Sequence, residues 1–259
     1  MTITNCFVSG FDEGTMLDGT RRVRDDSPTG RIKCGTESNG GFKNITISNC
    51  VFDHCRGLAL ETVDGGMLED VTISNITMRE INNAPIFLRL GSRMRGPKGT
   101  PVGELRRVNI SNVVIYYSAR TAGVIISGIP GHPIKDVNLS NIQIWFKGGG
   151  KKEQAAITPP ELENGYPEPE FFGVMPAYGF FLRHVKGITL DNIQLHTLTG
   201  DARPPFSLVD VDGAEFFRIK AQRGMGVPVF DVEKSANLTL RMVDGVKDRQ
   251  RKGSVQGRF

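Results

Sequence analysis

Acidic side chains gather near the start of the chain, where Asp12 and Glu13 adjoin and Asp18 follows in a turn-rich stretch. Two carboxyl groups can share acid–base work, because one donates a proton to a leaving oxygen while the other activates a water molecule. An acidic pair before a turn is also typical of a solvated loop. The sequence therefore indicates Asp12, Glu13 and Asp18 as candidate catalytic residues, with a solvated loop as the alternative.

Charged residues also occur in short apolar segments, at Arg31, Lys33, Glu61 and Arg89. Guanidinium and ammonium groups bind carboxylates, so the three cations could supply positive charge to one face of the molecule. Ordinary surface charge is the alternative interpretation. These four residues are candidates for substrate binding.

Three aromatic residues, Trp145, Tyr166 and Tyr178, are candidates for contact with a sugar. An aromatic face can stack on a pyranose ring, although packing of the surrounding chain accounts for such residues equally well. Tyr166 and Tyr178 join the substrate-binding candidates.

The histidines and cysteines do not indicate a metal site, because neither set has ligand spacing. We therefore expect no metal and no other cofactor, and we expect the cysteines to be buried free thiols. Serine and histidine occur without a nucleophile elbow, which gives a triad esterase little support. The residues concerned are His54, His132, His184, His196, Cys6, Cys34, Cys50 and Cys55.

A five-residue phrase recurs along the chain and determines how these residues are positioned. Apolar and polar residues alternate in each copy, as in a half-buried strand, and the interval of about 26 to 51 residues suits one coil of a β-helix. Stacked coils would bury a continuous core. The copies begin at Thr2, Thr46, Thr72, Asn109, Asn138 and Thr189.

An asparagine occupies the same position in every copy of the phrase, where the chain must turn. Asparagine tolerates left-handed backbone geometry, and its amide can bond the asparagine one coil away. We expect an internal asparagine ladder near one corner, and turn chemistry explains these residues without a ligand.

A second set of short strands precedes the phrases and should form another sheet. Alternation directs Leu60 and Leu88 inward and Phe87 outward. The outward columns are Lys33, Ala59, Phe87, Ile125 and Phe181, then Gly35, Glu61, Arg89, Ser127 and Arg183. On this surface we expect Glu61 and Arg89 to lie on neighbouring coils within ion-pair reach.

Composition and charge limit the class of protein. The chain has 259 residues, 39% hydrophobic and 23% charged, as in soluble globular domains. The net charge of +4 is spread along the chain apart from a basic C-terminal end, so we expect no nucleic-acid partner. No apolar run suits a membrane span and the first residues do not form a signal peptide, so we expect no membrane partner and infer no localisation.

The repeat suggests one β-helix domain over residues 1–242, followed by a basic tail over 243–259. Charged or Gly- and Pro-rich stretches at 18–28, 91–103 and 148–178 are expected to be inserted loops. A loop as long as the last is uncommon unless it is functional or disordered, and its aromatic residues favour an ordered flap.

Three segments resemble glycoside hydrolase family 28, the polygalacturonase and rhamnogalacturonan hydrolase group. They are Thr29–Gly41, Gly57–Gly66, and Tyr166–Pro169 with Pro176–Phe180. The similarity runs from about Thr2 to about Val232 and is especially close to a bacterial branch with a long Pro-rich flap.

This resemblance implies an all-β, right-handed parallel β-helix and inverting hydrolysis of α-linked uronic-acid polysaccharides. The family uses three Asp carboxylates of Asn-x-Asp and Asp-Asp motifs, both upstream of the part matched by Thr2, so the chain is expected to be truncated relative to the family. Two further family motifs, Gly-His-Gly and Arg-Ile-Lys, align with Thr29–Arg31 and Ala59–Glu61, where the histidine and both cations are replaced. Related proteins are secreted or periplasmic.

The leading hypothesis is a pectin-directed glycoside hydrolase-like domain for galacturonan or rhamnogalacturonan, weak or inactive without the upstream motifs. A non-catalytic carbohydrate-binding or structural β-helix is the second, and a pectin-type ester hydrolase is the third, because the fold alone does not determine the reaction. Reducing-end release, saccharide binding without such release, and methanol or acetate release distinguish the three.

The expected partners are a polysaccharide or oligosaccharide and a second copy of the chain. The sequence starts directly in a strand at Thr2, without a preceding cap, and an open end of a β-helix exposes strand edges. We therefore expect another copy, or the basic C-terminal tail, to cover this end near Ile3 and Phe7.

Overall fold

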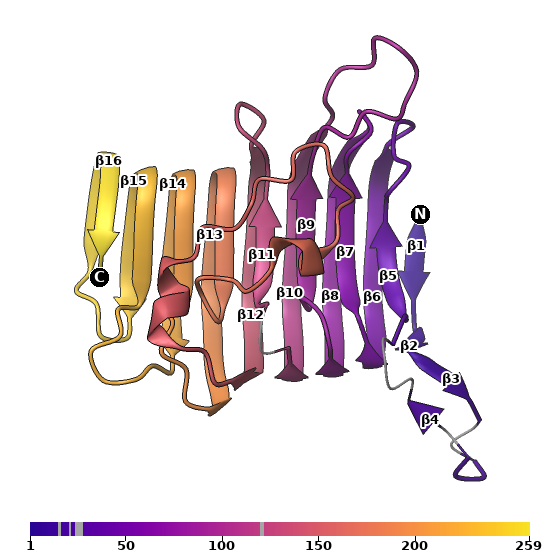
Figure 1. Cartoon of the computed structure of the whole chain (residues 1–259), viewed down its shortest axis with the longest axis horizontal. Coiled ribbons are helices and arrows are strands. Elements are labelled where there is room, and N and C mark those ends of the chain that lie inside the picture. Colours follow the sequence, from indigo (N-terminus) through magenta and orange to yellow (C-terminus); the bar gives the residue numbers. More distant parts are fainter. Residues whose placement is uncertain (15–16, 21, 24–27, 120–121) are drawn as a thin grey trace.

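The protein is represented by a computed structural model, which describes residues 1–14, 17–20, 22–23, 28–119 and 122–259. The chain is all-β, and its main feature is a large parallel sheet that curls back on itself (Figure 1). In the described ranges, no helix has the length and apolar character needed to cross a membrane.

Long strands carry the recurring phrase. They are β6 (Phe42–Cys55), β8 (Met67–Ile81), β10 (Glu104–Ser118) and β12 (Ile134–Gly148). They pair in parallel, so that Thr46, Thr72, Asn109 and Asn138 lie opposite one another, and β1 (Thr2–Thr4) and β2 (Phe7–Ser9) pair with β6. The repeated phrases therefore stack in register on neighbouring strands, as expected for stacked coils.

Short strands form the opposite run of the sheet. They are β5 (Arg31–Cys34), β7 (Gly57–Thr62), β9 (Ile86–Leu90) and β11 (Val124–Ser127). β13 (Phe180–Thr199) joins the two runs, because its first residues pair with β11 and its later residues pair with β12. β14 (Phe206–Ala221) and β15 (Phe230–Val243) continue the sheet in parallel. One short strand with the long strand that follows it is called a circuit below.

The apolar core fills the inside of the curl. Leu60, Leu88 and Leu182 of the short run meet the isoleucines of the long run there, as period-two alternation predicts. All four cysteines are free thiols; Cys34, Cys50 and Cys55 are buried and Cys6 is partly exposed.

The asparagine ladder forms, but on the outside of the molecule. Asn75, Asn112 and Asn141 each donate an amide hydrogen bond to the asparagine of the preceding circuit over 3.1 Å. Their φ angles of 54° to 55° place them in the left-handed region at one corner. The expectation of an internal ladder was wrong, because the positive φ turns each amide away from the core and leaves it exposed.

The C-terminal residues do not form a separate tail. β16 (Arg249–Arg258) pairs with β15 in the antiparallel direction, and Val255 is buried in the core. β16 therefore lies at the opposite end of the sheet from β1 (Figure 1), so the expectation that this tail covers the N-terminal end was wrong.

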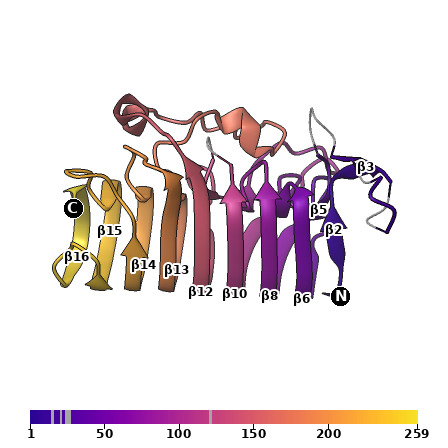
Figure 2. The ribbon, with the colours of Figure 1, turned by 90° about the horizontal axis from the view of Figure 1, so that it is seen from below.

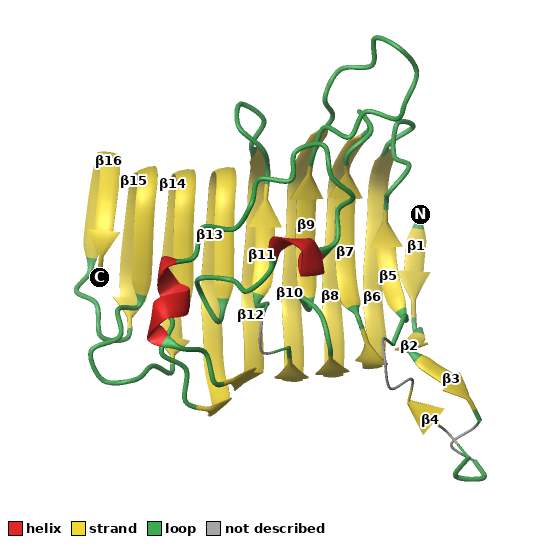
Figure 3. Cartoon of the chain, in the orientation of Figure 1, coloured by secondary structure: helices red, strands yellow, loops and turns green. Residues whose placement is uncertain are grey.

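Residues 149–179 link β12 to β13 and are called the insertion below. They contain two short 3-10 helices, Lys152–Ala156 and Pro169–Phe172, shown in red in Figure 3. The insertion lies along the outer side of the curled sheet (Figure 2). Residues 91–103 connect β9 to β10 without strand structure, and residues 21 and 24–27 of the expected loop 18–28 lie outside the described residues.

Candidate functional site

The insertion covers the outward face of the short strands. Ala59, Phe87 and Phe181 point away from the main core and pack against Phe172 and Met175 of the insertion. The rings of Phe87 and Phe172 meet edge to face, with centroids 6.0 Å apart. The alternation was therefore predicted correctly, but this face forms a second apolar core instead of a free surface.

Arg89 holds the insertion and is not available to a ligand. Its side chain is 1% exposed and donates hydrogen bonds to the carbonyls of Gly128 at 2.9 Å, Glu161 at 2.7 Å and Leu162 at 2.9 Å. Burial lowers the pKa of Arg89 to about 10, and the nearby Arg183 cation adds to this effect. The expectation that Arg89 lies exposed on the surface was wrong, because an insertion distant in sequence covers it.

Arg183 of β13 repeats this arrangement. It lies two strands away from Arg89 of β9, with β11 between them. Its guanidinium donates to the carbonyls of Pro159 and Pro160, both at 2.8 Å, and lies 3.2 Å from the Glu161 carboxylate. Together the two arginines bind four successive carbonyl groups of the insertion, from residue 159 to residue 162. They fix its position over the sheet.

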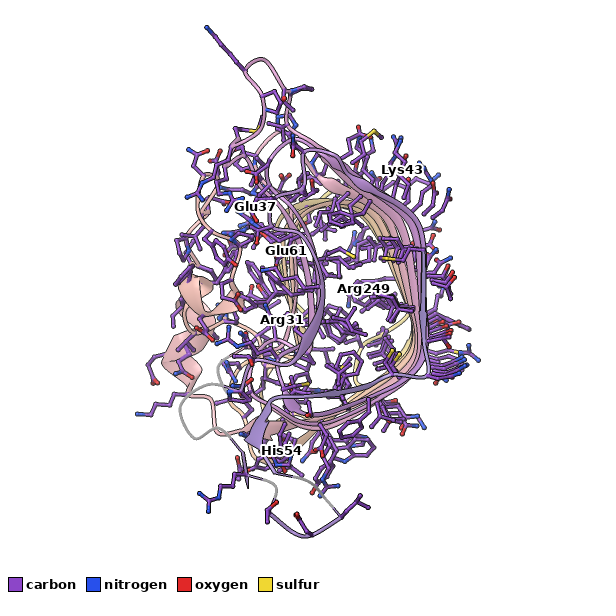
Figure 4. The ribbon with its side chains drawn as sticks, turned by 90° about the vertical axis from the view of Figure 1, so that its right-hand side faces the viewer. Arg31, Glu37, Lys43, His54, Glu61 and Arg249 are labelled. Carbon is purple, nitrogen blue, oxygen red and sulfur yellow. The ribbon has the colours of Figure 1, made fainter. Side chains whose placement is uncertain are left out.

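A partly exposed polar group lies near the β5 edge of the covered face. The Lys33 ammonium is 3.0 Å from Oε2 of Glu61, and Lys33 also donates to the Tyr166 phenol oxygen at 3.3 Å. Thr36 donates to the same phenol oxygen at 3.3 Å. These four residues are called the Lys33 cluster below. Figure 4, which looks along the curl, shows Glu61 and Arg31 on the side of the short strands that faces the insertion.

Exposure differs strongly within the Lys33 cluster. Glu61 has no exposed surface, whereas the Lys33 side chain is 21% exposed and Tyr166 is 46% exposed. Burial raises the pKa of Glu61 to about 7, although the Lys33 charge opposes the shift. Glu61 aligns in register with Arg89, but the expected contact between them is replaced by the pair with Lys33.

Arg31 is engaged by an acidic residue of the insertion. Its guanidinium lies 2.9 Å from the Glu168 carboxylate, which also accepts a hydrogen bond from Asn83 at 3.0 Å and lies 3.5 Å from Arg56. The sequence identifies Glu168 only as part of a Pro-rich motif. Its position between two prolines was the one available signal that it is held in a defined place.

Arg93 completes the polar surroundings of Tyr166. It forms an ion pair with the buried Asp64 carboxylate and lies 3.0 Å from Glu37, while its guanidinium is 5.9 Å from the Tyr166 ring centroid. The hydrogen bond from Arg93 lowers the pKa of Asp64. Sequence reasoning placed Arg93 only in a loop.

Several buried polar atoms around this site retain hydrogen-bonding capacity. Among the described residues, Glu61 Oε1, Arg31 Nε and Arg93 NH1 have no hydrogen-bond partner. Such atoms are costly in a folded protein unless another polar group satisfies them. Their concentration beside Tyr166 and Lys33 favours this place as a polar binding site.

The three acidic candidates lie elsewhere. Asp12 and Glu13 belong to β3 (Phe11–Glu13), which pairs with β4 (Arg22–Val23) in a two-stranded sheet separate from the main one, and their side chains lie outside the described part. Asp18 is exposed and accepts a hydrogen bond from the Thr20 amide at 2.9 Å. Hydrogen bonds from Thr20 lower the pKa of Asp18, which suits a carboxylate and not a proton donor.

Two of the three aromatic candidates are occupied by packing. Tyr178 is buried in the main core, where its hydroxyl donates to the Gln222 carbonyl at 2.5 Å. The Trp145 ring stacks on His196 with centroids 4.7 Å apart. Of the three, only Tyr166 lies beside the cations of the covered face.

The site can bind an anion or a polyol, since it combines an ammonium group, a carboxyl group that titrates near neutral pH and an exposed phenol ring. In the ranges that the structure describes, no group of three or more His, Cys, Asp or Glu residues could hold a metal ion. Comparison with protein-family models, with curated proteins and with solved structures finds no match for this chain.

Proposed function

We propose that this chain is a right-handed parallel β-helix of the family 28 type, directed to pectin, and that the Lys33 cluster binds α-linked galacturonan or rhamnogalacturonan. One observation supports this most. The three segments that carry the resemblance lie far apart in sequence, yet Lys33 and Thr36 of the first, Glu61 of the second and Tyr166 of the third lie together.

The chemistry of the cluster suits an acidic sugar. The Lys33 ammonium can pair with a uronate carboxylate, and the exposed Tyr166 ring offers a face to a pyranose. The Glu61 carboxyl group is wholly buried, so it acts on a ligand through the charge of the partly exposed Lys33 ammonium.

Hydrolysis is a separate part of the proposal. An inverting glycosidase needs a protonated acid and a second carboxylate roughly 6.5 to 9.5 Å away. Glu61 can hold a proton near neutral pH, whereas the acidic pair of β3 belongs to a different sheet. The geometry therefore supports uronate binding best, with cleavage of the glycosidic bond as the reaction to test.

Calorimetric titration with oligogalacturonate tests the binding site. We expect binding by the wild type, a loss of affinity of about fivefold in Lys33→Met and a similar loss in Tyr166→Ala, since each removes one contact worth about 1 kcal/mol. Lys43→Met is the matched control, because Lys43 projects from another corner (Figure 4) and pairs with Glu69 at 2.9 Å.

The same samples separate the remaining alternatives. New reducing ends would establish hydrolysis, and binding without them would establish a carbohydrate-binding domain. Methanol release from methyl-esterified pectin without new reducing ends would replace the proposal with an ester hydrolase. Equal affinity of Lys33→Met and the wild type would exclude the Lys33 cluster as the binding site.

A further inference from the structure

Two cysteines occupy adjacent positions of one inward column of the long run. Thr4 lies opposite Ser48 and Phe7 lies opposite Val51, so Cys6, between β1 and β2, lies opposite Cys50 of β6. The Cys6 carbonyl accepts a hydrogen bond from the Val51 amide at 2.9 Å. Every later described member of this column is aliphatic or β-branched: Ile76, Val113, Ile142, Ile193, Ile219 and Val243.

The two thiols also have the same local geometry. Cys6 Sγ donates to the Thr4 carbonyl at 3.4 Å, and Cys50 Sγ donates to the Ser48 carbonyl at 3.2 Å. Both contacts reach the residue two positions back, so the side chains point the same way from neighbouring strands. Burial raises the pKa of Cys50, and the adjacent Cys6 thiol contributes to the shift.

Strand spacing permits a covalent bond at this position. Paired strands lie about 4.8 Å apart. Disulfide-bonded cysteines usually have Cα atoms about 4.4 to 6.8 Å apart and Cβ atoms about 3.5 to 4.5 Å apart. The Cα spacing of paired strands meets the first condition, and closure of the bond requires the two Cβ atoms to approach by a few tenths of an ångström. Cys6 is partly exposed whereas Cys50 is buried, so an oxidant in solution reaches Cys6 first.

We propose that Cys6 and Cys50 form an oxidisable pair that closes into a disulfide and fastens the segment of β1 and β2 to β6. With a peroxide as oxidant, the Cys6 sulfur attacks one peroxide oxygen, the O–O bond breaks, and Cys6 sulfenic acid and one water form. The Cys50 sulfur then attacks the Cys6 sulfur, and the hydroxyl group leaves with the Cys50 proton as a second water. The two thiols lose two electrons in total, which reduce hydrogen peroxide to water.

The other two cysteines provide matched controls inside the same chain. Cys34 lies opposite Leu60 and Cys55 lies opposite Ile81, so neither has a thiol in register on the following strand. Both are buried, and burial raises the pKa of each to about 11. They should remain thiols under mild oxidation.

Peptide mapping by mass spectrometry under non-reducing conditions tests the pair on the full chain treated with hydrogen peroxide. We expect a cross-linked peptide that contains Cys6 and Cys50, loss of two titratable thiols, and recovery of both with dithiothreitol. Cys55→Ser should retain the cross-link, and Cys6→Ser and Cys50→Ser should each abolish it. Hydrogen exchange of the β1 and β2 amides should slow on oxidation in the wild type and in Cys55→Ser, and should stay unchanged in Cys6→Ser and Cys50→Ser.

Three results would overturn the proposal. They are oxidation of Cys6 to sulfinic acid without a cross-link, a bond between Cys6 residues of two chains, and a cross-link that persists in Cys50→Ser. Because thiol counting does not depend on activity or on sugar binding, this test is independent of the pectin proposal.

Discussion

Lys33 and Glu61 lie on adjacent strands with Nζ 3.0 Å from Oε2, yet the carboxyl group is wholly buried and the ammonium is partly exposed. The buried partner has lost its hydration, whereas the cation keeps part of its own. The carboxyl group therefore titrates near neutral pH, and the net charge of the Lys33 cluster changes in the same range.

Glu61 should make the stability of the chain fall as pH rises from about 4.5 to 7, the ordinary and the folded pKa of this carboxyl group. In this range the folded state keeps the proton and the unfolded state has released it, so stability is lost as pH increases. Glu61→Gln should gain about 3 kcal/mol relative to the wild type between pH 4 and pH 8. Urea unfolding at several pH values measures this; a difference that stays constant with pH would contradict the raised pKa.

Binding of oligogalacturonate should weaken as Glu61 ionises. Above pH 7 the Glu61 carboxylate neutralises Lys33, whereas below this pH the ammonium is free to pair with the ligand. We expect affinity about fivefold lower at pH 8 than at pH 6. Glu61→Gln should bind with little change over the same range, and a pH-dependent loss that persists in this variant would exclude Glu61 as its source.

Replacement of Arg89 should release the insertion. Arg89→Met leaves the covered carbonyls of Glu161 and Leu162 without their hydrogen-bond donor. This should destabilise the attachment of the insertion by about 2 to 4 kcal/mol. Faster amide exchange and proteolysis in residues 158–164 would show the release. Arg241→Met is the control, because Arg241 is half exposed and lies 3.8 Å from its acidic partner; equal protection in both variants would disprove the role of Arg89.

The asparagine ladder should stabilise the fold through its hydrogen bonds as well as through its backbone geometry. Asn112 donates to Asn75 and accepts from Asn141, both at 3.1 Å, and has a φ of 55°. Asn112→Ala should lower the free energy of unfolding by about 2 kcal/mol. Asn112→Gly should lower it by about 1 kcal/mol, since glycine adopts positive φ freely. Urea unfolding separates the two terms, and equal losses in both variants would remove the backbone contribution.

The alternation of residues along each strand was sufficient to predict the register of the strands and which side chains point inward or outward. Leu88 and Phe87 alternate between inside and outside because period two is a property of the extended backbone. The burial of Arg89 could not be predicted in this way, because its covering residues, Glu161 and Leu162, belong to an insertion far along the chain. Sequence alternation states which side a residue faces and not what lies above it.

The candidate site was predicted only in part for the same reason. Lys33, Glu61 and Tyr166 were named from sequence, but their proximity depends on how the insertion returns to β5. Glu168 and Arg93 were missed because neither residue type nor spacing distinguishes a buried ion-pair residue from a solvated one in a loop. The C-terminal residues were predicted to be a tail because they are mostly basic or polar. Val255 is the apolar residue by which β16 contributes to the core.

The antiparallel direction of β16 has a consequence for how copies of the molecule could assemble. A stack of parallel strands would otherwise offer, at one end, a template for the first strand of another copy, and repeated head-to-tail addition of this kind produces open fibres. β16 instead presents a reversed strand that carries Arg249, Arg251 and Lys252. A further strand that paired with the outer edge of β16 would meet reversed polarity and a positively charged edge, which disfavours continuation of the parallel stack in this direction.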